Sequence, residues 1–360
     1  MQITFSQTIK EIKTNIIFVS YSDLIDILKK DNIIIVIDGY VYRNYQHLFE
    51  GINDRIIIIN EKKGIKDFHT FKYICNELIN KKATTNTHLY GIGGGEVTDL
   101  VGFVASVYLR GIKVNFVPTT LLAMVDASIG GKNAINIGSI KNAVGTIYHP
   151  QNVYINTLFL ENCSQELLLG GFAEILKTGL LFDIKLLNDC LIFLDNFDFR
   201  GGQFPIVNDI IRRTISHKMK IIVEDNFNNR AFLNFGHTIG HILELDYDLP
   251  HGYAVAIGMI YESQIAVLLN LTDISIFNEI YRILTKYFKY NIEDYDLVKS
   301  ADKLLLDKKV TGNEIKIPVI EEIGRAKLVE IKLNDFMNCI NMKFNLSTKR
   351  IESTKEYGII

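Results

Sequence analysis

Two patterns of hydrophobic residues divide this chain. Up to about residue 157, short and nearly continuous runs of Ile and Val alternate with segments of helical periodicity. Continuous apolar runs are typical of strands that are buried on both faces of a parallel sheet. The strands predicted in this way are Ile33–Ile37, Arg55–Ile59, His88–Ile92, Lys113–Val117 and Val153–Ile155. Strands that alternate with helices predict a doubly wound α/β fold for this half.

From about residue 160 the strand-like runs fade and long amphipathic patterns follow. They predict helices over Gln165–Leu181, Val207–Val223 and Tyr253–Leu269. Because 360 residues exceed the usual size of one domain, we expect two. The first, residues 1–160, carries the parallel sheet, and the second, residues 161–360, is mostly helical. The cleft between them is the expected site.

Composition narrows the classes of partner. The 39 basic and 41 acidic residues give a formal net charge of −2, which leaves no basic excess for binding nucleic acid. No apolar run reaches 18 residues, which argues against a membrane span. No signal peptide is evident, and the four cysteines, Cys75, Cys163, Cys190 and Cys339, are widely scattered. We therefore expect a cytoplasmic protein without nucleic-acid or membrane partners.

A cluster of histidines is the first candidate for chemistry. His237 and His241 lie four residues apart, so that on a helix both imidazoles project from one face, and His251 follows ten residues later. This spacing suits a divalent metal, and a third ligand would complete an open catalytic site. The alternative is one histidine bonded to a backbone carbonyl and another that is solvated. We expect a catalytic metal site.

A glycine-rich segment follows the third predicted strand. In Gly91-Ile-Gly93-Gly94-Gly95-Glu96-Val-Thr-Asp99 the glycines allow backbone amides to approach a pyrophosphate at the start of a helix. The spacing is a variant of the dinucleotide motif, because Glu96 stands where the third glycine of GxGxxG would be. The alternative is a tight turn between strand and helix. Asp99 either caps that helix or holds a ribose hydroxyl.

Two further segments carry polar residues in apolar surroundings. Thr119 and Thr120 end a predicted strand, at the edge of the sheet where α/β proteins bind ligands. Asp126, Lys132 and Lys141 then follow in a Gly-rich stretch that suits a charged, hydroxyl-rich substrate, although a solvated loop would use the same residue types.

Glu174 and Lys177 lie within an otherwise apolar helical stretch. A buried carboxylate needs a partner, and either a metal or Lys177 would supply one. A surface pair at spacing i, i+3 is the alternative.

Read together, these segments resemble the 3-dehydroquinate synthase family of the shikimate pathway. The resemblance extends from about Asp38 to Arg325 and is carried most clearly by VPTTLLAMVDASIGGKNAIN and NFGHTIGH. It implies a Rossmann-like N-terminal NAD domain, a mostly α-helical C-terminal metal domain and a cytoplasmic homodimer. It also implies that Glu174, His237 and His251 bind Zn²⁺, or Co²⁺ in its place, and that His241 does not. The spacing argument alone favours His237 with His241.

The resemblance also implies roles for individual residues. Cofactor-binding positions are Asp38, Lys66, Gly93, Gly94, Gly95, Asp99, Thr119, Thr120, Lys132, Lys141 and Asn162. Catalytic positions are Asp126, Lys177, Lys218, Asn234 and His241. Substrate-binding positions are Arg110, Lys132, Asn142, Arg230, Lys308 and Lys309, of which Arg110 enters the neighbouring subunit's site. One of Lys308 and Lys309 matches the lysine of the family's DKK motif.

The implied reaction converts 3-deoxy-D-arabino-heptulosonate 7-phosphate to 3-dehydroquinate and phosphate. NAD⁺ transiently oxidises the C5 hydroxyl, phosphate leaves by β-elimination, hydride returns, and an intramolecular aldol step closes the ring. Because NAD is regenerated, the net reaction is that of a lyase. Lys132, Asn142 and Arg230 would hold the phosphate or phosphonate end.

Three other functions remain as alternatives at this point. Another sugar phosphate cyclase would use the same cofactors, whereas Lys218, Asn234 and His241 match the dehydroquinate pattern. An alcohol dehydrogenase of the glycerol dehydrogenase type offers no phosphate to Lys132 or Arg230. A non-catalytic remnant would not be expected to retain all three metal ligands.

The chain departs from the family pattern in three places. Lys63 replaces an acidic residue that contacts the adenosine, unless Glu61 substitutes for it. The loop 226–229 is about two residues short, and Asn162 replaces a threonine that often contacts the cofactor. These changes bear on NAD affinity and on the rim of the site.

Overall fold

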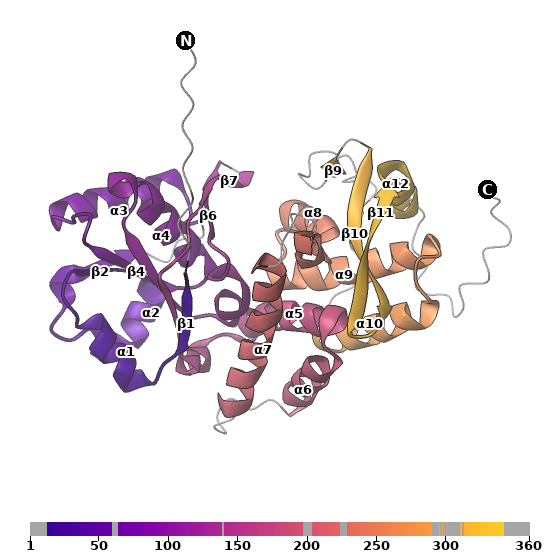
Figure 1. Ribbon diagram of the computed structural model, residues 1–360, viewed down its shortest axis with the longest axis horizontal. Helices are drawn as coiled ribbons and strands as arrows, with labels where there is room; N and C mark the ends of the chain where they lie inside the picture. Colours follow the sequence, from indigo (N-terminus) through magenta and orange to yellow (C-terminus); the bar gives the residue numbers. More distant parts are fainter. Residues whose placement is uncertain are drawn as a thin grey trace, which may run out of the picture.

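The computed structural model describes residues 13–59, 64–138, 140–196, 204–223, 229–289, 295, 297, 310–311 and 313–341. Glu61, Lys63, Lys308, Lys309 and residues 226–228 lie outside these ranges. Figure 1 shows a half built on a sheet, coloured indigo to magenta, beside a helical half coloured orange to yellow, with α5 and α7 between them.

The first half is built on a six-stranded sheet in which every pairing is parallel, in the order β1-β8-β5-β4-β2-β3. Its strands are β1 (Asn15–Phe18), β2 (Ile33–Asp38), β3 (Ile56–Ile59), β4 (His88–Gly93), β5 (Lys113–Pro118) and β8 (Asn152–Ile155). All five predicted strands are confirmed within one residue at each end, whereas β1 was not predicted. Most strand side chains are buried, as expected for a sheet covered on both faces.

Helices cover both faces of this sheet. They are α1 (Tyr21–Leu28), α2 (Gly39–Asn44), α3 (Phe68–Asn80) and α4 (Gly95–Val107). In Figure 1, α3 and α4 lie above the strands and α1 and α2 below them. The chain runs toward one edge of the sheet after β2 and toward the other after β4, and these two strands are neighbours. Their carboxyl ends, at Asp38 and Gly93, therefore form the topological switch point, where open α/β sheets bind ligands.

A two-stranded antiparallel ribbon leaves this half. It consists of β6 (Lys132–Ile137) and β7 (Ile140–Ile147). Seven of the eight residues of β7 are exposed, in contrast to the strands of the main sheet. Of the substrate residues expected in the Gly-rich stretch, Lys132 and Lys141 lie in this ribbon, whereas Asp126 lies before it in the short helix η4 (Ala123–Ala127).

The second half is mostly helical, as predicted. Its helices are α5 (Gln165–Phe182), α6 (Ile184–Asp195), α7 (Phe204–Val223), α8 (His237–Tyr247), α9 (His251–Leu268), α10 (Ile274–Tyr287) and α12 (Leu333–Asn341). The three predicted helices correspond to α5, α7 and α9. Helices α5 and α9 are apolar on nearly all sides and form the centre of this half. The predicted fold class is confirmed.

A small sheet in the second half was not predicted. Strands β9 (Val310–Thr311), β10 (Glu314–Glu322) and β11 (Arg325–Lys332) pair in antiparallel fashion. Figure 1 shows β10 and β11 crossing in front of α9 and α10.

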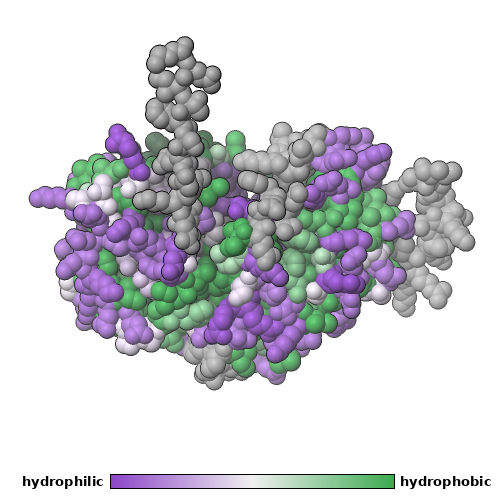
Figure 2. Space-filling view, viewed as in Figure 1, coloured by the Kyte–Doolittle hydropathy of each residue, from purple (hydrophilic) through white to green (hydrophobic). Residues whose placement is uncertain are grey.

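Figure 2 shows hydrophilic and apolar residues interspersed across both halves of this face. Among the described residues, no helix has the length and apolar character that crossing a membrane requires.

Candidate active site

A buried carboxylate and two imidazoles meet within the helical half. Glu174 of α5, His237 of α8 and His251 of α9 each offer one ligand atom, and these atoms lie within 4.8 Å of one another. Nε2 of His237 and Nε2 of His251 each lie 3.6 Å from Glu174 Oε1. Glu174 is 3% exposed, and its Oε1 has no hydrogen-bond partner. An orphaned carboxylate oxygen facing two imidazole nitrogens fits a divalent metal of the zinc type.

The charges around Glu174 keep it ionised. Its Oε2 forms an ion pair with Lys177, which is itself 3% exposed, so the alternative of a surface pair is wrong. Burial raises the pKa of Glu174, but Lys177 and His251 together lower it to about 2. Burial likewise disfavours charged His251, but its contacts with Glu174 and Glu244 raise its pKa to about 10. The carboxylate is therefore available as a metal ligand across the physiological pH range.

The start of α8 fixes His237. Its Nδ1 lies 3.1 Å from the carbonyl oxygen of Phe235, which leaves Nε2 to face Glu174. Gly236 precedes it at φ +78°, a conformation that favours glycine, and a Cβ there would lie 2.5 Å from the carbonyl oxygen of Val255. The helix start is held by Glu262 of α9, whose carboxylate accepts hydrogen bonds from the backbone N–H groups of Gly236, Thr238 and Ile239 at 2.8, 2.9 and 3.3 Å.

His241 does not belong to this group. It lies one turn further along α8, is exposed, and its ring centroid is 5.5 Å from that of His237. Spacing alone predicted a ligand pair of His237 and His241, and the structure corrects that pairing. The i, i+4 spacing places both rings on one face of α8, but the other two members of the group, Glu174 and His251, lie beside His237.

A second charged pair lies beside Glu174, His237 and His251, the candidate metal group. Lys218 of α7 donates to the backbone oxygen and to Oδ1 of Asp126, both at 2.6 Å. Burial raises the pKa of Asp126, but Lys218 lowers it below its ordinary value. Of the neighbouring charges, Glu174 raises this pKa and Lys177 lowers it. Lys177 also donates to the carbonyl oxygen of Leu233 at 2.9 Å, next to Asn234. The predicted catalytic residues Asp126, Lys177, Lys218 and Asn234 thus lie near one another.

The glycine loop and the two threonines lie side by side at the carboxyl edge of the sheet. Gly93 ends β4, Pro118 pairs with it at the end of β5, and the N–H of Thr119 donates to the carbonyl oxygen of Gly93 at 2.9 Å. A Cβ on Gly93 would lie 2.6 Å from Val97, so glycine allows α4 to begin directly behind the strand. The first N–H groups of α4 are therefore presented at the switch point, as an anion site requires.

Two acidic residues predicted at this edge have partners in the protein. Asp38 caps α2 and accepts hydrogen bonds from the N–H groups of Tyr40 and Val41 at 2.8 and 3.2 Å. Asp99 lies within α4 and forms an ion pair with Lys66, so the interpretation of Asp99 as a helix cap is wrong: the cap position is Gly94. Burial raises the pKa of Asp99 despite the Lys66 ammonium beside it.

Residues of the β6–β7 ribbon approach both halves. Lys66 donates to Asn142 Oδ1 at 2.5 Å, and Lys141 forms an ion pair with Glu244 of α8 at 2.9 Å. Lys132 is exposed at the start of β6.

Arg230 comes close to this ribbon from the helical half. It lies in the short helix η7 (Asn229–Asn234). The pKa of the His149 imidazole is lowered, first by burial and second by the positive charge of Arg230. His149 in turn packs on Gly131, the residue before Lys132. Arg230 therefore approaches the segment that leads into Lys132.

Two further predicted residues lie in short helices. Arg110 is exposed in the short helix η3 (Tyr108–Arg110) at φ +67°. Asn162 ends the short helix η5 (Thr157–Asn162), where its side chain donates to Tyr45 Oη at 2.7 Å and its carbonyl accepts from Tyr40 Oη at 3.2 Å. Lys308 and Lys309 are outside the described residues.

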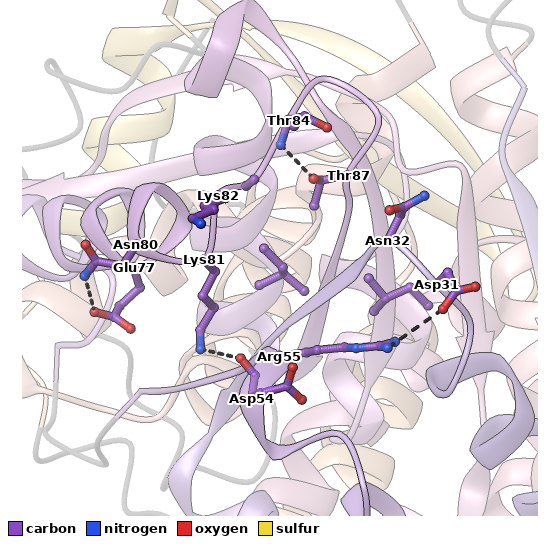
Figure 3. Close-up of a pocket in the computed structure, with 13 residues that line it drawn as sticks. Asp31, Asn32, Asp54, Arg55, Glu77, Asn80, Lys81, Lys82, Thr84 and Thr87 are labelled. Carbon is purple, nitrogen blue, oxygen red and sulfur yellow. Dashed lines mark hydrogen bonds and ion pairs between the residues drawn. The ribbon is translucent and has the colours of Figure 1, made fainter.

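A cavity among the described residues lies away from these groups. Its volume is about 890 Å³, and it is lined by the start of β2, the end of α3 and the segment before β3. Figure 3 shows Arg55 reaching toward Asp31, and Lys81 reaching the backbone oxygen of Asp54. Because it adjoins the amino ends of the strands, it is at the edge opposite the one where such sheets bind ligands.

Sequence reasoning missed two carboxylates that support the metal group. Glu244 contacts His251 Nδ1 at 2.5 Å, and Glu262 holds the start of α8. Both are buried within apolar helical stretches. The argument that singled out Glu174, a carboxylate that needs a partner in an apolar helix, applies equally to them.

The fold and this site define a class: two-domain enzymes that join a nucleotide-binding parallel sheet to a helical metal domain. Residues 56–169 match the family described as 3-dehydroquinate synthase N-terminal, and residues 171–310 match 3-dehydroquinate synthase C-terminal. The 3-dehydroquinate synthase of Saccharolobus solfataricus is 36% identical over 292 residues, which cover 78% of this chain and 82% of that protein. The chain belongs to the 3-dehydroquinate synthase family.

Solved structures of sugar phosphate cyclases share the fold. The 2-epi-5-epi-valiolone synthase of Streptomyces hygroscopicus subsp. jinggangensis, with NAD⁺ and Zn²⁺ bound, is similar at a TM-score of 0.82 and 21% identity, and the match covers 94% of this chain and 98% of that one. A 2-deoxy-scyllo-inosose synthase complexed with carbaglucose-6-phosphate, NAD⁺ and Co²⁺ gives a TM-score of 0.76 at 23% identity, over 91% and 95% of the two chains.

Proposed function

We propose that this chain is an active 3-dehydroquinate synthase that converts 3-deoxy-D-arabino-heptulosonate 7-phosphate to 3-dehydroquinate and phosphate. The observation that carries the proposal is the orphaned Oε1 of Glu174 facing Nε2 of both His237 and His251. Membership of the family supplies the reaction, and the site supplies the residues that the reaction needs.

Glu174, His237 and His251 would hold Zn²⁺, and the carboxyl edge of β2 and β4 would hold NAD. A bound zinc ion polarises substrate hydroxyls, and bound NAD⁺ accepts and returns a hydride. The glycine loop at Gly93–Gly95 and the start of α4 provide N–H groups for the dinucleotide's phosphates. Lys66 forms an ion pair with Asp99 and so offsets the negative charge of that carboxylate at this edge.

The chain's other polar residues would bind and orient the substrate. Lys132, Asn142 and Arg230 would hold the phosphate or phosphonate group. Asp126 and Lys218 form a fixed pair that can orient hydroxyl groups. His241 is exposed and one turn from His237, so it is placed to exchange a proton with a substrate hydroxyl.

We infer that residues 1–160 form the nucleotide domain and residues 161–360 the metal domain, and that the protein acts in the cytoplasm. The four cysteines support the second inference, because all are free thiols.

We infer that the protein is a homodimer that pairs through the β6–β7 ribbon. Ile140 and Ile147 of β7 are 64% and 68% exposed, and Val144 between them is 45% exposed. An exposed apolar strand at the edge of a ribbon favours association with another chain.

Ile147→Lys is therefore expected to convert the dimer to a monomer, as measured by light scattering after size exclusion. Ile79→Lys on α3 is the matched control, because Ile79 is 63% exposed and lies outside the ribbon. A wild-type monomer, or a dimer that survives Ile147→Lys and dissociates with Ile79→Lys, contradicts this assignment.

The proposed substrate is tested by comparing two sugar phosphates. The expected result is phosphate release from 3-deoxy-D-arabino-heptulosonate 7-phosphate and none from glucose 6-phosphate, whose carbocyclic analogue occupies the 2-deoxy-scyllo-inosose synthase structure. Release from glucose 6-phosphate alone would assign the chain to a different cyclase.

A further inference from the structure

A carboxylate outside the candidate metal group holds one of its members. Glu244 Oε1 lies 2.5 Å from His251 Nδ1, and Glu244 is 8% exposed. Nε2 of the same imidazole faces Glu174 at 3.6 Å. A carboxylate that accepts the Nδ1–H bond fixes the ring orientation, so that Nε2, once metal binding displaces its proton to solvent, directs its lone pair at the metal.

The second oxygen of this carboxylate is held from the other half of the molecule. Lys141 Nζ on β7 donates to Glu244 Oε2 at 2.9 Å. The Lys141 side chain is 52% exposed, whereas that of Glu244 is 7% exposed. Glu244 lies seven residues after His237, about two turns, so α8 presents a proposed metal ligand and the support of a second one on the same face.

The ribbon that carries Lys141 also contacts the carboxyl edge of the sheet, where the nucleotide is proposed to bind. Asn142, the next residue, accepts a hydrogen bond from Lys66, and Lys66 forms an ion pair with Asp99 of α4. The contacts therefore run without interruption from the helix of the glycine loop, through β7, to Glu244.

We propose that Glu244 is a positioning residue that orients His251 toward the metal, and that Lys141 links this carboxylate to the β6–β7 ribbon. The inference rests on the metal site proposed above. Its consequence is that metal affinity depends on a contact between the two halves of the chain.

Zinc affinity of the full chain, measured by competition with a chromophoric chelator, tests the role of Glu244. Glu244→Gln is expected to weaken zinc binding by about 10- to 100-fold, because the amide keeps the size of the side chain but loses the charge. Glu244→Asp, which keeps the charge, is expected to fall between Gln and wild type. Glu166→Gln on α5 is the matched control, because Glu166 is exposed and outside these contacts, and it should stay within about twofold of wild type.

The same assay tests Lys141 through a double-mutant cycle. Lys141→Met is expected to shift zinc affinity by about two- to fivefold, as for a half-exposed ion pair, and this shift should vanish in the Glu244→Gln background. Lys185→Met, exposed on α6, is its control.

Three outcomes decide the matter. If wild-type protein and Glu244→Gln bind zinc equally well, the role of Glu244 is overturned, whereas the proposed metal site stands. A Lys141 effect that persists unchanged in the Glu244→Gln background would overturn the link. Wild-type protein that does not bind zinc would overturn the metal site as well. If Glu244→Gln fails to fold by circular dichroism, Glu244→Asp and Lys141→Met decide.

Discussion

His251→Ala is expected to abolish turnover while leaving NAD⁺ binding intact. The substitution removes one of three proposed ligands and also leaves the buried Glu244 without its imidazole partner. Loss of a ligand from an open metal site should lower phosphate release by at least about a thousandfold. The glycine loop and the carboxyl ends of β2 and β4 are unaffected, so the NAD⁺ dissociation constant should stay within about twofold of wild type.

The measurement combines steady-state phosphate release with fluorescence titration of NAD⁺. His88→Ala is a suitable control, because His88 begins β4 at the end of the strand opposite Gly93. It should retain both activity and metal. An equal loss of NAD⁺ affinity in His251→Ala would show that His251 does not act through a metal site separate from the nucleotide site.

Glu262→Met is expected to destabilise the helical half and to weaken metal binding. Glu262 is 1% exposed and accepts hydrogen bonds from three N–H groups at the start of α8. Methionine has a similar size but no acceptor oxygen, so these buried donors would lose their partner. At about 1 to 3 kcal/mol for each unsatisfied donor, the free energy of unfolding should fall by at least about 3 kcal/mol. His237 is the first residue of α8, so its orientation should loosen as well.

Urea denaturation and chelator competition would measure the two effects. Glu262→Gln keeps one acceptor oxygen and should fall between Met and wild type, whereas Glu166→Met on the exposed first turn of α5 should change the free energy of unfolding by less than about 0.5 kcal/mol. A Glu262→Met protein as stable as wild type would show that the hydrogen bonds at the start of α8 are not needed.

The main sheet was predictable because strands that are buried on both faces appear in the sequence as continuous apolar runs. Runs such as Ile33–Ile37 are apolar throughout, and the structure makes them strands. The unpredicted strands obey different rules. Strand β1 has no fully buried side chain, and β7 owes its form to pairing with β6 rather than to burial. Strands β10 and β11 form a hairpin whose pattern was overlooked in a half expected to be helical.

The candidate site was predictable in its residue types but not in its pairings. Helical spacing places His237 and His241 on one face, yet it cannot show that α5 and α9 bring Glu174 and His251 to His237. The resemblance supplied that grouping. Glu244 and Lys141 are 103 residues apart, so their contact depends on how the ribbon meets α8. Only the folded structure shows it.

The most direct test of the account is phosphate release from 3-deoxy-D-arabino-heptulosonate 7-phosphate by the wild-type protein. The assay is run with and without NAD⁺, and before and after treatment with a chelator. The account predicts many turnovers for each NAD⁺ with no net NADH, loss of activity with chelator, and recovery with zinc. Folded, zinc-loaded protein that releases no phosphate from this substrate in the presence of NAD⁺ would contradict it.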